Sequence, residues 1–101
     1  MKTSELSGAA LDWAVTKANG NWAFLPDGCD AYSSDWAHGG PIIEREYIQL
    51  TIDLGWIATR KEGPAVSEEH GPTPLIAAMR CYVASVLGDE VEIPATLLET
   101  V

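Results

Sequence analysis

The hydrophobic positions near the start of the chain recur at the spacing of an α-helix. One side of a helix predicted over residues 8–19 carries the apolar side chains Leu11, Ala14, Val15 and Ala18. Ser7 is a favourable N-cap, and Gly20 stands just past the end of the pattern. Trp13 points almost the opposite way, so we expect it to be covered by the following loop, by a partner or by a ligand.

A second helical pattern, the clearest in the chain, occupies residues 74–87. Thr73 at the N-cap, Pro74 in the first turn and Gly88 beyond the last turn mark its two ends. The broad apolar face, which predicts a core helix, consists of Leu75, Ile76, Met79, Tyr82, Val83, Val86 and Leu87. The small side chains of Ala77, Cys81 and Ala84 lie opposite, where a second helix or a second subunit could approach closely.

Between the two helices the pattern changes to the two-residue alternation of a half-buried strand. Apolar positions 48, 50 and 52 alternate with polar ones, and Gly55 offers a turn, so residues 56–59 are predicted to return as the second strand of an antiparallel hairpin. A short strand is also predicted at residues 22–25. The segments 29–41 and 60–72 contain many turn-forming residues and are expected to be exposed loops.

These elements predict a single compact α+β domain over residues 1–101, with two helices packed on a small, mainly antiparallel sheet. A chain of 101 residues can bury one modest core but not two. No apolar run is long enough to cross a bilayer, and the start lacks the apolar segment of a signal peptide. We therefore expect a cytoplasmic protein without a membrane partner.

Charge and cysteine content narrow the classes of function. Six basic residues against fifteen acidic ones give a formal charge of -9, which disfavours binding to DNA or RNA. Cys29 and Cys81 are the only cysteines and are expected to be free thiols. Neither stands at ligand spacing from another cysteine or a histidine, and no nucleotide-cofactor motif is present, so we predict neither a metal site nor a cofactor.

Three separated blocks of the chain carry a family resemblance. They are KTSELSGAALDWAV at residues 2–15, SSDWAHGGPIIERE at residues 33–46 and GPTPLIAAMRCYVASVLGDEVEIP at residues 71–94. In this order they resemble the NinX-like family of small phage-encoded proteins. The resemblance implies an origin among phage or prophage accessory genes and action in the host cytoplasm, and it supplies no catalytic motif. The segments 21–31 and 49–69 depart most from the pattern.

The candidates for catalysis are few. His38 and His70 are the only imidazoles, and neither stands in a recognised spacing with a cysteine or serine nucleophile. Glu44 and Glu46 could form a carboxylate pair, although a solvated charged strip explains them as well. A non-enzymatic role is therefore favoured.

A binding site is the stronger prediction. Trp36 could stack on a planar ring, Gly39 and Gly40 could let backbone N–H groups approach a ligand, and Arg45 could meet an anionic group, with His38 beside them. The alternative interpretation is that Trp36 fills the core and that Arg45 pairs with a nearby acid.

Two further residues extend this predicted site. Thr73 and the free N–H groups of the helix that follows could form a second anion-facing surface. Arg80 lies at the edge of the apolar face of that helix and could reach inward to neutralise a buried carboxylate or a ligand.

Three hypotheses of function follow. The first is a non-enzymatic binder that sequesters a small, nucleotide-like host signalling molecule to counter antiviral defence, as a homo-oligomer whose interface completes the pocket. The second is an acidic inhibitor of a host enzyme or nucleic-acid-binding protein, with Trp13 or Trp56 as interface anchors. The weakest is a hydrolase of a small metabolite that uses His38 or Cys81.

Overall fold

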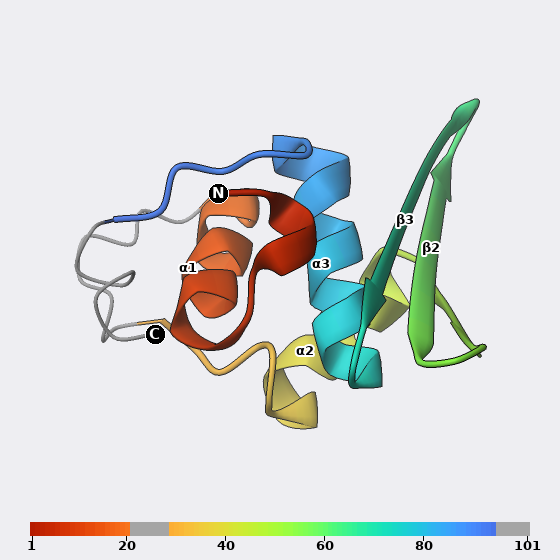
Figure 1. Ribbon diagram of the computed structural model, residues 1–101, viewed down its shortest axis with the longest axis horizontal. Helices are drawn as coiled ribbons and strands as arrows, with labels where there is room; N and C mark the ends of the chain where they lie inside the picture. The colour runs from red at the N-terminus through yellow and green to blue at the C-terminus, as the bar shows by residue number, and fades with distance from the viewer. Residues whose placement is uncertain (21–28, 95–101) are drawn as a thin grey trace.

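The computed structural model describes residues 1–20 and 29–94, and the strand predicted at residues 22–25 lies outside these ranges. The described elements are, in chain order, η1 (Thr3–Glu5), α1 (Gly8–Ala18), α2 (Trp36–Arg45), β1 (Gln49–Ile52), β2 (Trp56–Glu62), β3 (Ala65–Gly71) and α3 (Pro74–Leu87) (Figure 1). This is the predicted α+β class with an antiparallel sheet, although the described residues contain three α-helices instead of two.

Both predicted helices form where their end signals placed them. The Thr73 hydroxyl accepts the backbone N–H of Ile76 at 3.1 Å, which caps α3, and Pro74 occupies its first turn. Gly88 ends α3 with a φ of 89°, a left-handed value that favours glycine. Ser7 precedes α1 as expected, although its side chain makes no capping hydrogen bond.

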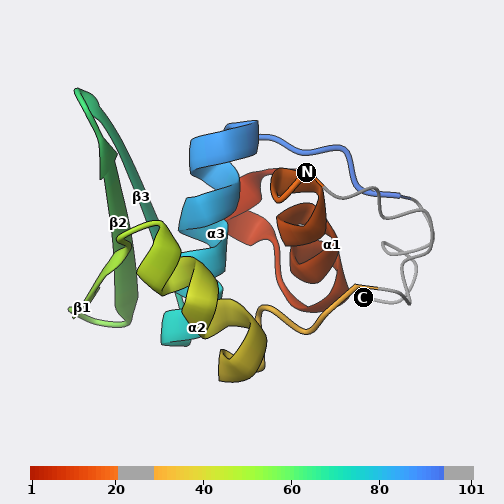
Figure 2. The ribbon, with the colours of Figure 1, turned by 180° about the vertical axis from the view of Figure 1, so that it is seen from behind.

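Helix α2 corrects the prediction of a loop over residues 29–41. The side chain of Asp35 accepts the N–H of Ala37 at 2.9 Å and so begins the helix. Gly39, Gly40 and Pro41 are poor helix formers, which is why the sequence predicted a loop. Packing stabilises the helix in spite of these residues, because α2 lies against α3 and leads into β1, as seen from behind in Figure 2.

The sheet has the order β1-β2-β3, and both neighbouring pairs are antiparallel. The predicted hairpin of β1 and β2 is confirmed, with Leu50 opposite Ala58. The exposed loop predicted at residues 60–72 is wrong, because β2 continues and β3 returns after a turn in which Gly63 has a φ of 57°. β3 reads AVSEEHG, which lacks the apolar alternation by which a strand is recognised.

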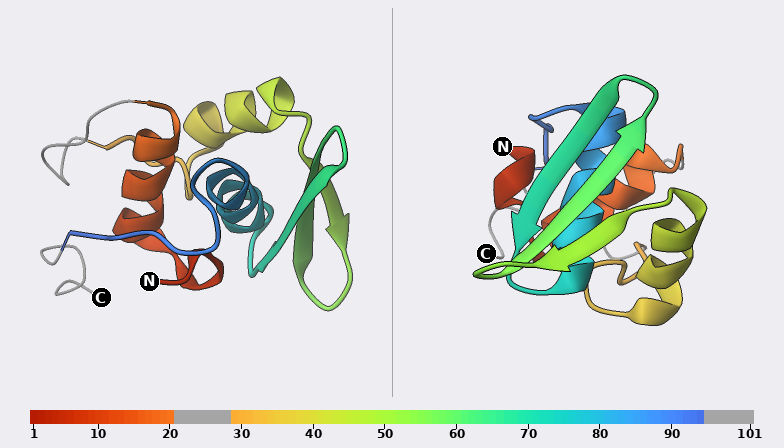
Figure 3. Two further views of the ribbon diagram at one scale, coloured as in Figure 1. Left: turned by 90° about the horizontal axis from the view of Figure 1, so that it is seen from above. Right: turned by 90° about the vertical axis from the view of Figure 1, so that its right-hand side faces the viewer.

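Helix α3 occupies the middle of the molecule, between the sheet and α1 (Figure 3). Its small-residue side, expected to receive another helix or subunit, is covered by the sheet instead. Ala77 and Cys81 are fully buried, and the Cys81 thiol donates to the carbonyl oxygen of Ser67 at 3.4 Å. A Cβ atom on Gly71 would lie 2.7 Å from the backbone nitrogen of Ala77, so only glycine permits this approach. Val86, predicted to face the core, is 47% exposed.

The start of the chain is joined to the segment that follows α3. The Met1 ammonium group donates to the carbonyl oxygen of Val91 at 3.0 Å. The backbone N–H of Thr3 donates to the carbonyl oxygen of Asp89 at 2.8 Å. The fully buried Thr3 also donates its hydroxyl to the carbonyl oxygen of Gly88 at 2.7 Å. Within the described residues, no helix has the length and apolar character needed to cross a membrane.

Candidate functional site

The residues predicted to bind a ligand are distributed over separate surfaces. Trp36 begins α2 and Arg45 ends it, so a helical rise of 1.5 Å per residue separates them by about 14 Å along the axis. Trp36 lines a recess with Thr73, whereas Arg45 lies on a different surface with Tyr47. Arg80 lines a third recess. The structure therefore does not bring Trp36 and Arg45 together in one recess, because residues 36–45 form a helix where the sequence predicted a loop over residues 29–41.

The Trp36 recess lies between the start of α2 and the start of α3. Its volume is about 320 Å³, and it is lined by Ser33, Ser34, Trp36, Thr73, Pro74, Leu75 and Ile76. Trp36 is 52% exposed, so the alternative in which it fills the core is wrong. The recess thus presents an apolar aromatic face next to hydroxyl groups.

Ser33, which lines this recess, is hydrogen-bonded to α1. The backbone N–H of Ser33 donates to Oδ1 of Asp12 at 2.8 Å. Burial raises the pKa of the Asp12 carboxyl above its usual range, and the hydrogen bonds from Ser33 oppose that shift. The segment that precedes α2 is therefore anchored through a half-buried carboxyl group.

The two adjacent glycines of α2 have different surroundings. A Cβ atom on Gly39 would lie 2.5 Å from the carbonyl oxygen of Tyr32 and 2.6 Å from Cδ2 of Leu75. A Cβ atom on Gly40 would meet only Cε3 of Trp36, at 3.7 Å. Gly39 therefore permits the packing of α2, and the expectation that it lets a ligand approach the backbone is wrong because protein atoms already occupy that space.

His38 lies among acidic side chains outside the lining of the Trp36 recess. Its Nδ1 is 3.8 Å from Oδ2 of Asp30, and its Nε2 is 3.8 Å from Oδ2 of Asp35. The ring of Tyr32 meets the imidazole edge-on, with the two centroids 6.1 Å apart. The imidazole of His38 in α2 therefore lies beside residues 30–35, which precede the helix.

Arg45 belongs to a polar network at the other end of α2. Its Nε donates to Glu46 at 2.7 Å, and its Nη2 donates to Asn19 at 3.0 Å and to the Tyr82 hydroxyl at 3.1 Å. The interpretation in which Arg45 pairs with a nearby acid is thus confirmed. The same Glu46 carboxylate accepts from Nη2 of Arg60 at 2.8 Å, so it joins α2 to β2.

The Glu46 carboxylate is held in its charged form by these two arginines. Its pKa is lowered from 4.5, chiefly by the hydrogen bond from Arg45 and further by the charges of both guanidinium groups. The Arg60 side chain is only 14% exposed, and its Nε is buried without a hydrogen-bond partner in the described part of the chain. Sequence spacing offered no signal for this network, since its members come from four separate elements and their ends.

Arg80 reaches inward as expected, and its hydrogen bonds go to backbone carbonyl groups. Its Nε donates to the oxygen of Leu6 at 2.7 Å, and its Nη1 donates to that of His70 at 2.8 Å. Burial lowers the pKa of the guanidinium, whereas the charge of Glu69 opposes this. These bonds attach α3 to the start of the chain and to the end of β3.

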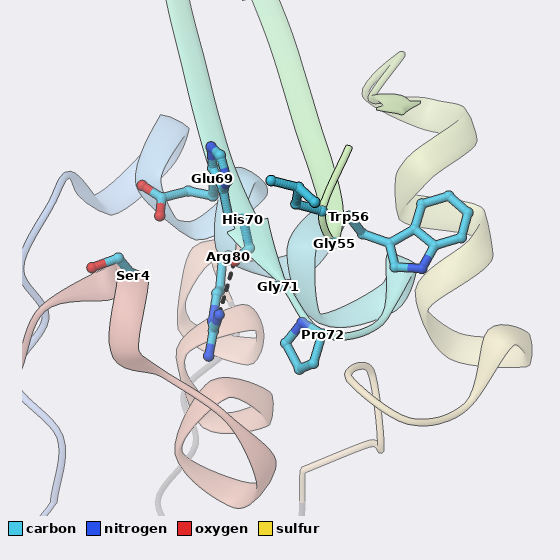
Figure 4. A pocket seen from close by; sticks show the side chains of 9 residues that line it. Ser4, Gly55, Trp56, Glu69, His70, Gly71, Pro72 and Arg80 are labelled. Carbon is cyan, nitrogen blue, oxygen red and sulfur yellow. Dashed lines mark hydrogen bonds between the residues drawn. The ribbon is translucent and has the colours of Figure 1, made fainter. Parts of the chain in front are cut away.

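The recess beside Arg80 has a volume of about 470 Å³. It is lined by Ser4, Leu54, Gly55, Trp56, Glu69, His70, Gly71, Pro72 and Arg80 (Figure 4). In Figure 4 the Trp56 indole extends away from Arg80, toward the opposite side of Gly71. The two side chains therefore line this recess from opposite sides of Gly71.

The two tryptophans expected to anchor a partner are both half-buried against the core. The ammonium group of Lys17 lies 5.4 Å from the centroid of the Trp13 ring, and Ile93 and Pro94 border the same surface recess. Neither Trp13 nor Trp56 stands out as a fully exposed aromatic anchor.

The groups considered for catalysis are engaged in other contacts. Burial raises the pKa of the Cys81 thiol to about 11, so the thiol stays protonated and a poor nucleophile near neutral pH. His70 faces Glu68, with Nε2 3.5 Å from Oε2. No group of three metal-ligating side chains occurs in residues 1–20 and 29–94.

The fold and these surfaces define a small α+β protein with shallow recesses around a central helix. The family model described as NinX of bacteriophage P22 matches residues 2–86, and the chain belongs to this phage protein family. The resemblance carried by the three sequence blocks is thereby confirmed. No curated protein matches the chain.

Proposed function

We propose that this protein of a phage family is a non-enzymatic binder that takes up a small planar molecule of nucleotide-like chemistry at the Trp36 recess. Sequestering a host signalling molecule in this way would counter antiviral defence. The observation that carries the proposal is the Trp36 indole, which is 52% exposed beside a recess of about 320 Å³. An aromatic face left in water next to a concave surface is suited to stacking on a planar ring.

The chemistry around the indole suits a ligand with both a ring and an anionic group. The first turn of the 14-residue helix α3 borders the recess, and helix N-termini favour negative charge. The hydroxyl of Ser34, on the exposed side of the recess, offers a hydrogen bond. The volume is near the lower end of the roughly 300–1,000 Å³ common for ligand sites, so one ring system would fill it.

Calorimetry against cyclic dinucleotides, cyclic trinucleotides and ADP-ribose conjugates tests the proposal. We expect saturable binding by the purified protein, loss of binding in Trp36→Ala, and recovery of the ligand chemically unchanged. Tyr47→Ala is the matched control, because Tyr47 is an aromatic side chain that is 86% exposed at the far end of α2. Flat titrations across the whole panel, or equal loss in both variants, would contradict the proposal.

A second candidate is an acidic inhibitor of a basic host enzyme or nucleic-acid-binding protein. The formal charge of -9 on 101 residues favours it, because such a charge steers association toward basic surfaces. A complex of this kind should weaken steeply as salt is added, whereas ring stacking at Trp36 should respond weakly. Affinity for an isolated host partner, measured at low and high ionic strength, separates the two candidates.

A further inference from the structure

Strand β1 forms an edge of the sheet. It pairs with β2 on one side, and no other described strand lies on its second side. Three of its four residues are exposed. An edge strand of this kind presents unpaired N–H and C=O groups that can pair with another chain.

Large apolar side chains are exposed at three positions along this edge, which we define as residues 47–54. Tyr47 is 86% exposed, Ile52 is 69% exposed, and Leu54 is completely exposed. Tyr47 and Leu54 are also the two non-glycine residues with positive φ among the described residues, at 54° and 56°. Such a conformation is unfavourable for bulky side chains, and their exposure gives the single chain no packing in return.

The opposite edge of the sheet is protected. Strand β3 carries the charged side chains of Glu68 and Glu69. Charged side chains are a usual means of preventing edge-to-edge pairing. β1, whose sequence is QLTI, is the one strand of the three without a charged residue.

We propose that the 47–54 edge is a dimerisation surface, at which β1 of one copy pairs antiparallel with β1 of a second copy to form a continuous six-stranded sheet. The formal charge of -9 makes contact between two copies unfavourable over most of the surface, whereas residues 49–52 carry no charge and Asp53 is the one charged residue of the 47–54 edge. The proposal does not depend on a ligand, since Trp36 lies at the far end of α2 from β1.

Symmetry agrees with this pairing. A two-fold axis normal to the sheet keeps each face of one copy continuous with the same face of the other. Leu50 and Ile52 share the face on which Ala58 is buried against α3, so the apolar face would extend across the dimer. Ile52, exposed in the single chain, would become part of that extended face.

Sedimentation velocity and light scattering of the full chain test the proposal. We expect the wild-type protein to have twice the mass of one chain. Ile52→Glu places a like charge on each copy at the pairing edge and should weaken association by roughly tenfold or more, which lowers the average mass measured near the wild-type dissociation constant. Val66→Glu is the matched control and should remain dimeric, because Val66 is 60% exposed on the opposite edge strand.

Hydrogen exchange locates the contact. Backbone amides of residues 49–52 should be protected in the wild type and in Val66→Glu, and should lose that protection in Ile52→Glu. If circular dichroism shows that Ile52→Glu does not fold, Leu54→Glu replaces it as the test variant. The Leu54 side chain is fully exposed, so this change should leave the fold intact. A monomeric wild type up to its solubility limit, equal dissociation by the β1 and β3 variants, or a dimer that persists in folded Leu54→Glu would each overturn the proposal.

Discussion

At the scale of single residues, Gly39 and Gly40 allow a direct test of why α2 contains a glycine pair. Gly39→Ala should lower the free energy of unfolding by about 1–3 kcal/mol, because the new methyl group meets the backbone oxygen of Tyr32. Gly40→Ala should raise it by up to about 1 kcal/mol, because alanine favours the helix and has room there. Urea unfolding of the two variants measures both effects, and changes of the same sign would contradict the packing described for α2.

The two cysteines should differ in reactivity for a reason that is also local. Cys81 is fully buried with a pKa raised to about 11, whereas Cys29 is half-buried. A thiol reagent at mildly alkaline pH should therefore modify one thiol quickly and the second only at the rate of unfolding. Absorbance of the released reporter group follows the reaction, and Cys29→Ser should remove the fast phase. A fast phase that survives in Cys29→Ser would show that Cys81 is accessible.

At the scale of elements, Glu46 couples α2 to β2 and makes that contact dependent on pH. Its folded-state pKa is lowered from 4.5, so its contribution to stability is present above that value and is lost as the pH falls through the lower folded pKa. Glu46→Gln should therefore flatten the decline of stability between about pH 5 and pH 3. At neutral pH the same change should lower the free energy of unfolding by about 1–3 kcal/mol, because Arg60 loses a charged partner while it is largely buried.

Glu62→Gln is the control for this prediction. The Glu62 carboxylate also accepts from Arg60, at 2.9 Å, but its side chain is 71% exposed. Ion pairs at such positions contribute little, so the pH profile of chemical unfolding should stay close to that of the wild type. Equal profiles for the Glu46 and Glu62 variants would argue against a coupling of α2 to β2 through Glu46.

The elements that sequence reasoning missed, α2 and β3, lack a strong local signal. In α2 the three consecutive residues Gly39, Gly40 and Pro41 argue against a helix, and the close contact with Tyr32 and Leu75 explains the glycine at position 39. In β3 the side chains that face α3 are small or charged, so Ser67 and Gly71 fit where an apolar pattern would have been recognised. The formation of α2 and β3 therefore depends on tertiary contacts.

At the scale of the whole molecule, Thr3 joins the start of the chain to the end of α3. Thr3→Val should lower the free energy of unfolding by about 1–3 kcal/mol, because the carbonyl oxygen of Gly88 would be left in a partly buried place without its 2.7 Å hydrogen bond. Ser4→Ala, at the exposed neighbouring position, should change it little. Thermal and urea unfolding compare the two, and equal stability of both variants would contradict this role for Thr3.

The distribution of the predicted site residues is also a property of the whole molecule. Trp36 and Thr73 come together because the starts of α2 and α3 meet, whereas Arg45 and Arg80 bind groups of the protein itself. Their residue types suited anion binding, and the sequence offered pairing of Arg45 with an acid only as an alternative, whereas nothing in it indicated that two backbone carbonyl groups would accept from Arg80. The predicted site is thus reduced to the aromatic part around Trp36.

The sequence by itself determined α1, α3, the hairpin of β1 and β2, and membership of the phage family. These features depend on caps, turns and periodicity that act within a few residues, or on matching blocks of sequence. The tertiary structure alone decided that residues 36–45 form a helix, that the sheet covers the small-residue side of α3, and that the Trp36 recess and the edge at β1 remain open. These outcomes depend on contacts between residues far apart in the chain, and no local pattern encodes such contacts.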